Sequence, residues 1–113
     1  MDFIGFKNDG TYVMGLKGKL DALTSPAFRE QLIVAIDQGE RDILLDCSDL
    51  DYVSSAGLRV LFEAAFKLQE LSGRFDCCSV NPNVRKIFDL VDLPSEIPLF
   101  ASREEALRVR GGA

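Results

Sequence analysis

The sequence predicts an α/β domain built on a single mixed, mostly parallel β-sheet of about five strands, with about four α-helices. Helical segments alternate with β-favouring runs after residue 20, which is typical of parallel strands joined by crossover helices. An Asp-Gly pair separates the first two runs and predicts an antiparallel hairpin at one edge. The length of 113 residues, 47% of them hydrophobic, suits one domain, expected over residues 1–110 with a disordered tail at 111–113.

The first two strands are expected at residues 3–6 and 11–16, joined by the turn Asn8-Asp9-Gly10. The first helix is expected to begin at Ser25-Pro26, because Ser is a preferred N-cap and Pro is favoured at the first helical position. Apolar residues then recur at helical spacing, which predicts a buried face made of Phe28, Leu32, Ala35 and Ile36. Gly39 is expected to end this helix.

A central strand is expected at residues 42–46, where three apolar residues lie between two acids. Residues 48–55 are mostly polar and are expected to form a loop. The second helix is expected from Ala56 to Leu71, and Gly73 ends it. Its inward stripe is predicted to consist of Gly57, Leu61, Ala64, Leu68 and Leu71.

The remaining elements continue the alternation. A strand is expected at residues 75–80, and Asn81-Pro82 predicts the cap and start of a third helix, which Pro94 stops. Its buried face is predicted to hold Val84, Ile87, Phe88 and Val91. Residues 97–100 are expected to form a short edge strand. The run Ser102-Arg103-Glu104-Glu105 is a capping box and predicts a final short helix.

Charge and composition disfavour several classes of function. The chain has 13 Lys and Arg against 18 Asp and Glu, and its net charge of −5 argues against binding to nucleic acid or to an anionic membrane surface. It contains no His, the commonest general base and metal ligand. No GxGxxG or Walker loop is present. We therefore expect a protein that is not an enzyme and has neither a cofactor nor a metal site.

The cysteines and the chain start predict a cellular compartment. Cys47, Cys77 and Cys78 are odd in number and include no CxxC pair, so we expect buried, reduced thiols. The first residues lack the basic and apolar regions of a signal peptide, and no apolar run approaches the roughly 18 residues of a membrane span. A cytoplasmic protein is expected. The sequence contains no signal for a particular oligomeric state.

The most informative segment is Asp51–Val60, which reads DYVSSAGLRV. Ser54 and Ser55 stand where a loop enters the second helix, and the unpaired N–H groups and dipole of a helix start favour a negative group. The small residues Ala56 and Gly57 leave the hydroxyl approachable, so a phosphate would be well accommodated. Two interpretations stay open: the serine is only a helix cap, or it is a phosphorylation site.

This segment resembles the signature of the STAS domain, a family named for sulfate transporters and anti-sigma factor antagonists. Among its members, single-domain bacterial anti-sigma factor antagonists are the most similar. Other segments resemble the family in the same order along the chain, namely Gly18–Asp21, Ile43–Asp46 with Leu50, and Asn81–Phe88. The resemblance spans nearly the whole chain and implies the STAS α/β fold.

The resemblance also implies a partner-switching protein. In similar proteins a serine at this helix start is phosphorylated by a partner that is both anti-sigma factor and serine kinase. The unphosphorylated form binds that partner and releases a sigma factor, and a PP2C-like phosphatase restores the cycle. Because the acceptor lies two residues before the family's Gly, Gly57 identifies Ser55 as the acceptor. Many members have Asp directly before the acceptor, whereas this chain has Ser54, which becomes a second candidate.

Acidic residues are expected close to the acceptor. The resemblance matches Asp21 to an acidic position near the phosphorylated serine, and Asp46 to a polar position at the end of the central strand. Phosphorylation adds about 1.5 to 2 negative charges, which would weaken an interface pressed against Ser55 while leaving the fold little changed. The alternative function is a constitutive STAS binding module or scaffold, such as a lipid-transport subunit, in which Ser55 is only a cap.

A second apolar face of the second helix bears on docking. Leu58, Phe62 and Phe66 recur beside Ser55 at four-residue spacing. They are either buried in the domain or form an exposed patch that meets the partner. On the second interpretation the partner-binding residues are Ser54, Ala56, Gly57, Leu58, Arg59 and Phe62.

Overall fold

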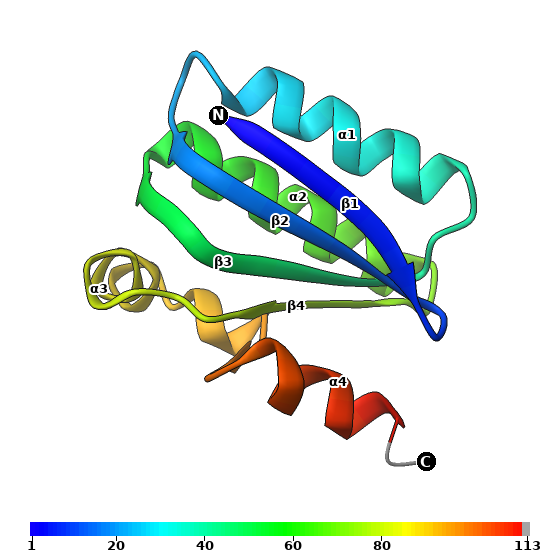
Figure 1. Cartoon of the computed structure of the whole chain (residues 1–113). Helices are drawn as coiled ribbons and strands as arrows, with labels where there is room; N and C mark the ends of the chain where they lie inside the picture. The colour runs from blue at the N-terminus through cyan, green and yellow to red at the C-terminus, as the bar shows by residue number, and fades with distance from the viewer. Residues whose placement is uncertain (112–113) are drawn as a thin grey trace.

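The computed structural model of the chain describes residues 1–111 and has one sheet with helices on both faces (Figure 1). The strands are β1 (Asp2–Asn8), β2 (Thr11–Leu20), β3 (Asp42–Val53), β4 (Arg74–Cys78) and β5 (Leu99–Phe100). The helices are α1 (Ser25–Asp37), α2 (Ser55–Glu70), α3 (Pro82–Leu90) and α4 (Arg103–Gly111), with a 3₁₀ turn η1 at Leu93–Ser95. The strand order is β1-β2-β3-β4-β5, in which β1 and β2 are antiparallel and the other pairs are parallel. The predicted fold class is confirmed.

The two faces of the sheet carry two separate apolar clusters. The larger cluster packs α1, α2 and α3 against one face, with Leu45 and Cys77 among the strand residues. The smaller cluster packs Ala106 of α4 against Leu44 and Cys78 on the other face. The separation follows from the alternation of side chains along a strand, since consecutive residues point to opposite faces. Figure 1 shows α4 on the side of the sheet away from α1 and α2.

β3 is longer than the sequence analysis predicted. The expected loop at residues 48–55 was wrong, because β3 continues to Val53 and pairs in parallel with the end of β2. Register shifts between Gly15 and Lys17 and between Gly18 and Lys19 interrupt the two-residue alternation. This interruption hides the strand pattern, since Leu50 and Val53 are buried whereas the residues between them are exposed.

Capping residues explain where the helices begin. Asn81 caps α3 by accepting a hydrogen bond from the Val84 N–H at 2.8 Å, and Ser102 accepts one from the Glu105 N–H at 3.0 Å, as predicted. The N-cap of α1 is Thr24 rather than the predicted Ser25, whose hydroxyl is buried and donates to the Asp21 carbonyl. α3 and α4 therefore begin where they were predicted to begin, whereas α1 and α2 each begin one residue earlier than predicted.

α4 is tied to the sheet by ion pairs. Arg110, 8% exposed at its side chain, contacts Asp42 at 2.8 Å and the buried Asp76 at 2.8 Å. Arg103 pairs with Asp46 at 2.6 Å. α4 includes Gly111, the first residue of the predicted tail, and residues 112–113 lie outside the described part of the chain.

The buried cysteines match their predicted state. Cys47, Cys77 and Cys78 are free and buried. Burial raises the pKa of the Cys78 thiol to about 12, so this thiol stays protonated and unreactive at neutral pH. None of the helices within residues 1–111 is both long and apolar enough to cross a bilayer.

Candidate functional site

The start of α2 divides the two serines into different roles. Ser54 is the N-cap, with extended backbone angles (φ −95°, ψ 175°), and its hydroxyl oxygen accepts a hydrogen bond from the Gly57 N–H at 3.4 Å. Its own N–H donates to the Leu20 carbonyl at 2.8 Å and so ties the helix start to the end of β2. The cap function that the sequence left open between the two serines therefore belongs to Ser54.

Ser55 is the first residue of α2 and is exposed. Within residues 1–111 its hydroxyl makes no hydrogen bond to another residue, so no side-chain base is positioned to activate it as a nucleophile. The first N–H groups of a helix lack intrahelical partners and, with the helix dipole, favour an anion. This arrangement suits a hydroxyl that accepts a phosphoryl group from another protein.

Gly57 sets how closely α2 approaches the sheet. A Cβ atom at this position would lie 2.7 Å from the Leu20 Cγ and 2.9 Å from the Val53 Cγ2, closer than carbon atoms pack. Only glycine therefore lets the first turn of α2 rest on the ends of β2 and β3. The motif glycine has a packing role, and it fixes where Ser55 emerges.

The predicted partner-binding residues separate into surface and core. Gly57 and Leu58 are buried, so neither meets a partner without unfolding of the helix start. Arg59 is exposed, and Ala56 is partly exposed. Phe62 is half-buried and stacks on Phe66, with ring centroids 6.1 Å apart. The second face of α2 is thus mostly core, and Phe66 is its main exposed apolar residue.

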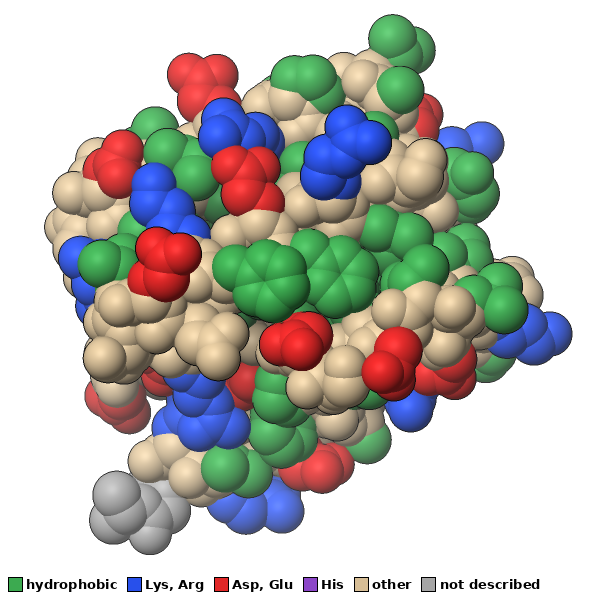
Figure 2. All heavy atoms as spheres, turned by 180° about the vertical axis from the view of Figure 1, so that it is seen from behind, with side chains coloured by type: hydrophobic (Ala, Val, Ile, Leu, Met, Phe, Trp, Pro, Cys, Tyr) green, Lys and Arg blue, Asp and Glu red, His purple; other side chains and the backbone are tan. Residues whose placement is uncertain are grey.

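A shallow groove lies beside Ser55, between the starts of α1 and α2. Its volume is about 310 Å³, and its lining includes Pro26, Ala56 and Val60. Arg29 and Glu63 close one side through a double hydrogen bond, the shortest contact being 2.6 Å, and this bond lowers the pKa of Glu63. Figure 2 looks at this helical side of the molecule, where apolar side chains gather between charged ones.

The loop between β2 and α1 presents one large exposed apolar side chain, Leu23, which is 90% exposed. The loop is held by Asp21, whose Oδ1 accepts hydrogen bonds from the Thr24 N–H at 3.1 Å and the Leu23 N–H at 2.9 Å. The Thr24 hydroxyl donates to the Lys19 carbonyl at 2.8 Å. The hydrogen bond from the Thr24 N–H is the main cause of the lowered pKa of Asp21. Leu23 is therefore an exposed apolar residue on a backbone that is held by hydrogen bonds.

Leu23 was missed in the sequence analysis. An apolar residue between Asp and Thr in a turn is the signal that could have found it, because Asp and Thr side chains commonly bond to nearby backbone. The loop lies at the same end of the sheet as Ser55, because Leu20 pairs with Val53 and Asp21 follows Leu20.

The two predicted acids lie in different places. Asp21 is at the end of β2, next to the residue whose carbonyl binds the Ser54 N–H. Asp46 is not near Ser55, because it lies in the middle of β3, roughly 20 Å of strand before Val53. It faces the opposite side of the sheet, where it is bonded to Arg103 of α4. Its position at the end of a short predicted strand was misleading, since β3 continues well beyond it.

The described residues near Ser55 offer hydroxyl, cationic and apolar groups for contact with another protein. No group of three or more potential ligands that could hold a metal ion occurs within residues 1–111. The features near Ser55 are an exposed hydroxyl, an exposed arginine, a shallow groove and an exposed leucine. Together they can contact another protein.

Comparison with known proteins gives a consistent result. Residues 7–106 match the STAS domain family. BtrV of Bordetella bronchiseptica, whose name describes it as an anti-sigma factor antagonist, is 36% identical over 100 residues that cover 88% of this chain and 86% of that protein. The anti-sigma factor antagonist SpoIIAA in its unphosphorylated form has a TM-score of 0.75 and 28% identity, covering 97% of this chain and 99% of that one. The phosphorylated form of Bacillus SpoIIAA has a TM-score of 0.74 and 26% identity, covering 94% and 96%.

Proposed function

This chain belongs to the STAS domain family, and from that premise we propose that it is an anti-sigma factor antagonist controlled by phosphorylation of Ser55. In its unphosphorylated form it docks an anti-sigma factor that is also a serine kinase, and a sigma factor is released. A PP2C-like phosphatase removes the phosphate again. The observation that carries the proposal is the exposed, unbonded hydroxyl of Ser55 at the first position of α2.

Relatives support the kind of partner and the kind of control. The similar proteins are named as anti-sigma factor antagonists, and one solved relative is described in both unphosphorylated and phosphorylated forms. In the proposed reaction the Ser55 oxygen attacks the γ-phosphorus of ATP held by the kinase. A new P–O bond forms, ADP leaves, and the hydroxyl proton passes to a base of the kinase. The phosphatase then hydrolyses the ester with water.

The contact area proposed for the partner is the Ser55 surface, which we define as Leu23, Ser55, Ala56 and Arg59 with the adjoining groove. Leu23 can fill an apolar pocket on the partner, because 90% of it is exposed and the hydrogen bonds of Asp21 hold its backbone in place. Arg59 forms no ion pair within residues 1–111, so its charge is available to an acidic group. The surface thus offers one apolar and one cationic contact around the hydroxyl.

A phosphate on Ser55 is expected to weaken partner binding in two ways. Arg59 follows Ser55 by four positions, the spacing at which helical side chains meet, with the anion on the N-terminal side as favoured. The phosphate can therefore pair with Arg59 in the free protein, which stabilises the modified helix and withdraws the arginine from the partner. At the same time, burying a doubly charged group in the interface costs several kcal/mol unless a cation meets it.

The direct test uses the full chain with each candidate serine kinase of the same bacterium and ATP. Intact mass and peptide fragmentation are expected to show one phosphoryl group on Ser55. Ser55→Ala is expected to receive none, whereas the matched variant Ser54→Ala still receives it. Phosphate found on Ser54 alone would contradict the assignment of the acceptor.

Binding of the partner tests the switch itself. Ser55→Asp is expected to keep the far-UV circular dichroism spectrum of the wild type and to bind the kinase at least tenfold more weakly, a loss of about 1.4 kcal/mol or more. Ser55→Ala should bind like the unphosphorylated protein. If no kinase modifies the chain and Ser55→Asp binds a partner as tightly as the wild type, the chain is a constitutive STAS binding module.

A further inference from the structure

The outer edge of β1 is open to solvent. β1 is the first strand in the sheet order, and its outer side pairs with no other strand within residues 1–111. Every residue of β1 except Phe3 is exposed, so none of the described helices or loops covers this edge. A free edge presents a row of unpaired N–H and C=O groups, which is a template for pairing with another strand. The function proposed above makes no use of this edge.

β1 lacks the features that usually protect a sheet edge. Natural proteins protect edges with short strands, proline, bulges or charged side chains. The strand at the opposite edge, β5, has only two residues and follows Pro98. By contrast, β1 has seven residues, contains no proline and pairs with β2 without a register shift. Its two charged residues are Asp2, at one end, and Lys7, which is held by Glu40 at 2.6 Å. β1 is therefore the unprotected edge of this sheet.

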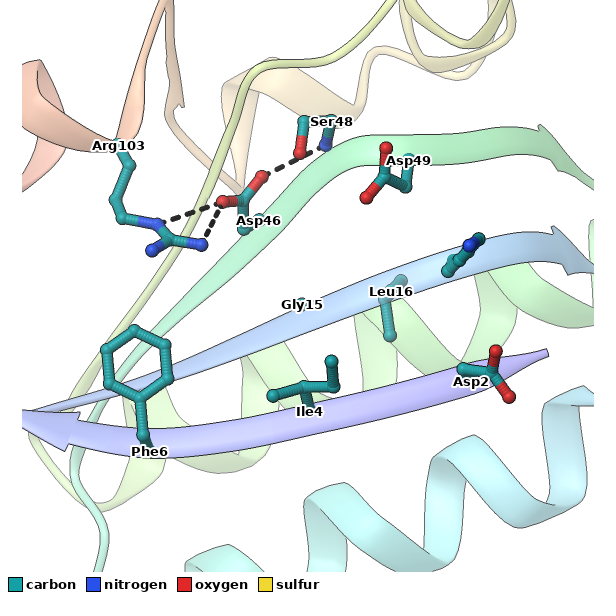
Figure 3. A pocket seen from close by; sticks show the side chains of 10 residues that line it. Asp2, Ile4, Phe6, Gly15, Leu16, Asp46, Ser48, Asp49 and Arg103 are labelled. Carbon is teal, nitrogen blue, oxygen red and sulfur yellow. Dashed lines mark hydrogen bonds and ion pairs between the residues drawn. The ribbon is translucent and has the colours of Figure 1, made fainter.

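One face of β1 carries exposed apolar side chains. Ile4 is 69% exposed and Phe6 is 38% exposed. Figure 3 shows both on the sheet face toward Arg103, where they border a hollow of about 280 Å³ above Gly15. The Arg103 guanidinium lies 5.3 Å from the centre of the Phe6 ring, which favours one orientation of that ring. A strand added beside β1 would cover both apolar side chains.

The hairpin turn determines which main-chain groups of β1 point outward. Asp9 and Gly10 both have positive φ angles, as in a type I′ turn, so the flanking residues Asn8 and Thr11 form a hydrogen-bonded pair. Hydrogen-bonded pairs alternate with non-hydrogen-bonded pairs along an antiparallel ladder. The main-chain groups that point away from β2 therefore belong to Phe3, Gly5 and Lys7.

A second copy of the chain fits this edge in one register. Antiparallel pairing about Gly5 sets the whole of one β1 against the whole of the other, and the residues with outward-pointing groups meet one another. Gly5 has no side chain, and Tyr12 of the same copy covers it, so the twofold axis is free of β1 side chains. Ile4 then faces the second copy's Phe6 on each side of the axis, which makes one continuous apolar patch.

The charges of β1 are compatible with this register. Asp2 faces the second copy's Asn8, and Lys7 faces its Phe3, so no like charges are opposed. A shift of the register by two residues shortens the paired segment and, in one direction, sets Asp2 against Phe6. Pairing about Gly5 is therefore the register that uses the full strand and leaves the apolar side chains together.

The flank of α1 on the β1 side carries no charge. Arg29 and Asp37 contact Glu63 and Lys67 of α2, at 2.6 and 3.9 Å, and so mark the flank that faces α2. On the opposite flank exposed, uncharged residues recur at helical spacing, namely Ala27, Gln31, Val34 and Gln38. Figure 1 shows α1 alongside β1 at this edge of the sheet. In the paired arrangement both α1 helices lie on the same sheet face, and their uncharged flanks face one another.

We propose that two copies of this chain associate by antiparallel pairing of their β1 strands about Gly5, so that one sheet runs through both copies. The interface is small, with about six new main-chain hydrogen bonds, so the dimer is weak and reversible. The pairing uses none of the residues of the Ser55 surface. It therefore neither requires nor prevents phosphorylation of Ser55.

Sedimentation equilibrium of the full chain, from about 10 µM to about 1 mM, tests the association over the range expected for a small interface. We expect the mean mass to rise from 12.5 kDa toward twice that value. Ile4→Lys is expected to weaken the dimer at least tenfold, because it sets a charge against the second copy's Phe6 and a lysine on an edge strand opposes pairing. Leu90→Lys is the matched control, since it adds the same charge on α3 at a residue that is 85% exposed, and it should associate like the wild type.

Two outcomes of this measurement would overturn the proposal. A wild-type chain that stays monomeric at about 1 mM, where weak dimers of small interfaces form, would leave the edge to a strand of another protein. Undiminished association of folded Ile4→Lys would place the interface elsewhere on the molecule.

Cross-linking tests the register. Ile4 and the second copy's Phe6 form a non-hydrogen-bonded pair with Cα atoms about 4.5 Å apart, within the range of a disulfide. An equal mixture of Ile4→Cys and Phe6→Cys with oxidised glutathione is expected to give a disulfide-linked heterodimer, because the natural cysteines are buried. Either variant alone should give little covalent dimer, since identical positions are not opposed. Equal cross-linking by Ile4→Cys alone, or by Leu90→Cys mixed with Phe6→Cys, would refute the register.

Discussion

Replacing Gly57 by Ala tests whether the motif glycine is a packing residue. The added Cβ would lie 2.7 Å from the Leu20 Cγ and 2.9 Å from the Val53 Cγ2, where carbon atoms normally pack at about 3.5–4.0 Å. Leu20 and Val53 are 0% and 1% exposed, so neither side chain has free space into which to move. The helix start must therefore shift outward by roughly 1 Å or the core must rearrange.

The magnitude follows from two opposing contributions. Overpacking a well-filled core costs about 1–3 kcal/mol, and contacts this short belong to the upper part of that range. Ala is favoured over Gly inside a helix by about 1 kcal/mol, which offsets part of the cost. We expect Gly57→Ala to lower the free energy of unfolding by about 1–2 kcal/mol.

Urea denaturation followed by far-UV circular dichroism measures this difference, since the chain contains no Trp for fluorescence. Gly15→Ala is the matched control, because the same added methyl group meets only the Ile4 carbonyl oxygen at 3.8 Å. The control is expected to leave stability unchanged or to raise it by up to about 1 kcal/mol. Equal or greater stability of Gly57→Ala than of the wild type would refute the packing argument.

Three further changes have defined outcomes. Leu23→Ala should change the free energy of unfolding by less than about 0.5 kcal/mol and weaken kinase binding by about 1.5–3 kcal/mol, as measured by surface plasmon resonance. The control Val109→Ala, on α4, should bind the kinase like the wild type. The Asp46 carboxylate has a lowered pKa, so its contribution to stability is present above about pH 3.8 and is lost as the pH falls further. The difference in free energy of unfolding between the wild type and Asp46→Asn should therefore shrink below about pH 3.8. A difference that stays constant through this pH range would contradict the prediction. Arg110→Met should lower the free energy of unfolding by about 1–3 kcal/mol in urea denaturation, because the buried Asp76 loses one of its two arginine partners and keeps only Arg74 at 2.6 Å. An equal loss in Arg108→Met would point to helix propensity instead.

Local sequence patterns correctly predicted those elements whose ends are marked by a turn or by a capping residue. The Asp-Gly hairpin, the Asn81 cap and the Ser102 cap depend on residues within a few positions of each other, and all three are present. The end of β3 has no such signal. It is set by pairing with β2 across a shifted register, so a polar sequence that looks like a loop is part of a strand.

The candidate site was predictable in position but not in composition. The motif places Ser54 and Ser55 at a helix start, and both are there. The sequence left open whether Leu58 is buried or at the surface, and α2 is held so close to the sheet that this residue is buried. Asp46 was expected near Ser55, but it belongs to the far face, because a strand turns neighbouring side chains to opposite sides.

The sequence by itself determined the alternation of elements, the helix start that presents Ser55 and the acidic character of the chain, since these depend on local spacing and on counting charges. Only the tertiary structure decided which side chains are accessible. It exposed Leu23, buried Leu58 and left the space above Gly15 empty. The physical reason is that exposure depends on which distant segments pack against a residue, and the register between β2 and β3 sets those contacts without a local signal in either strand.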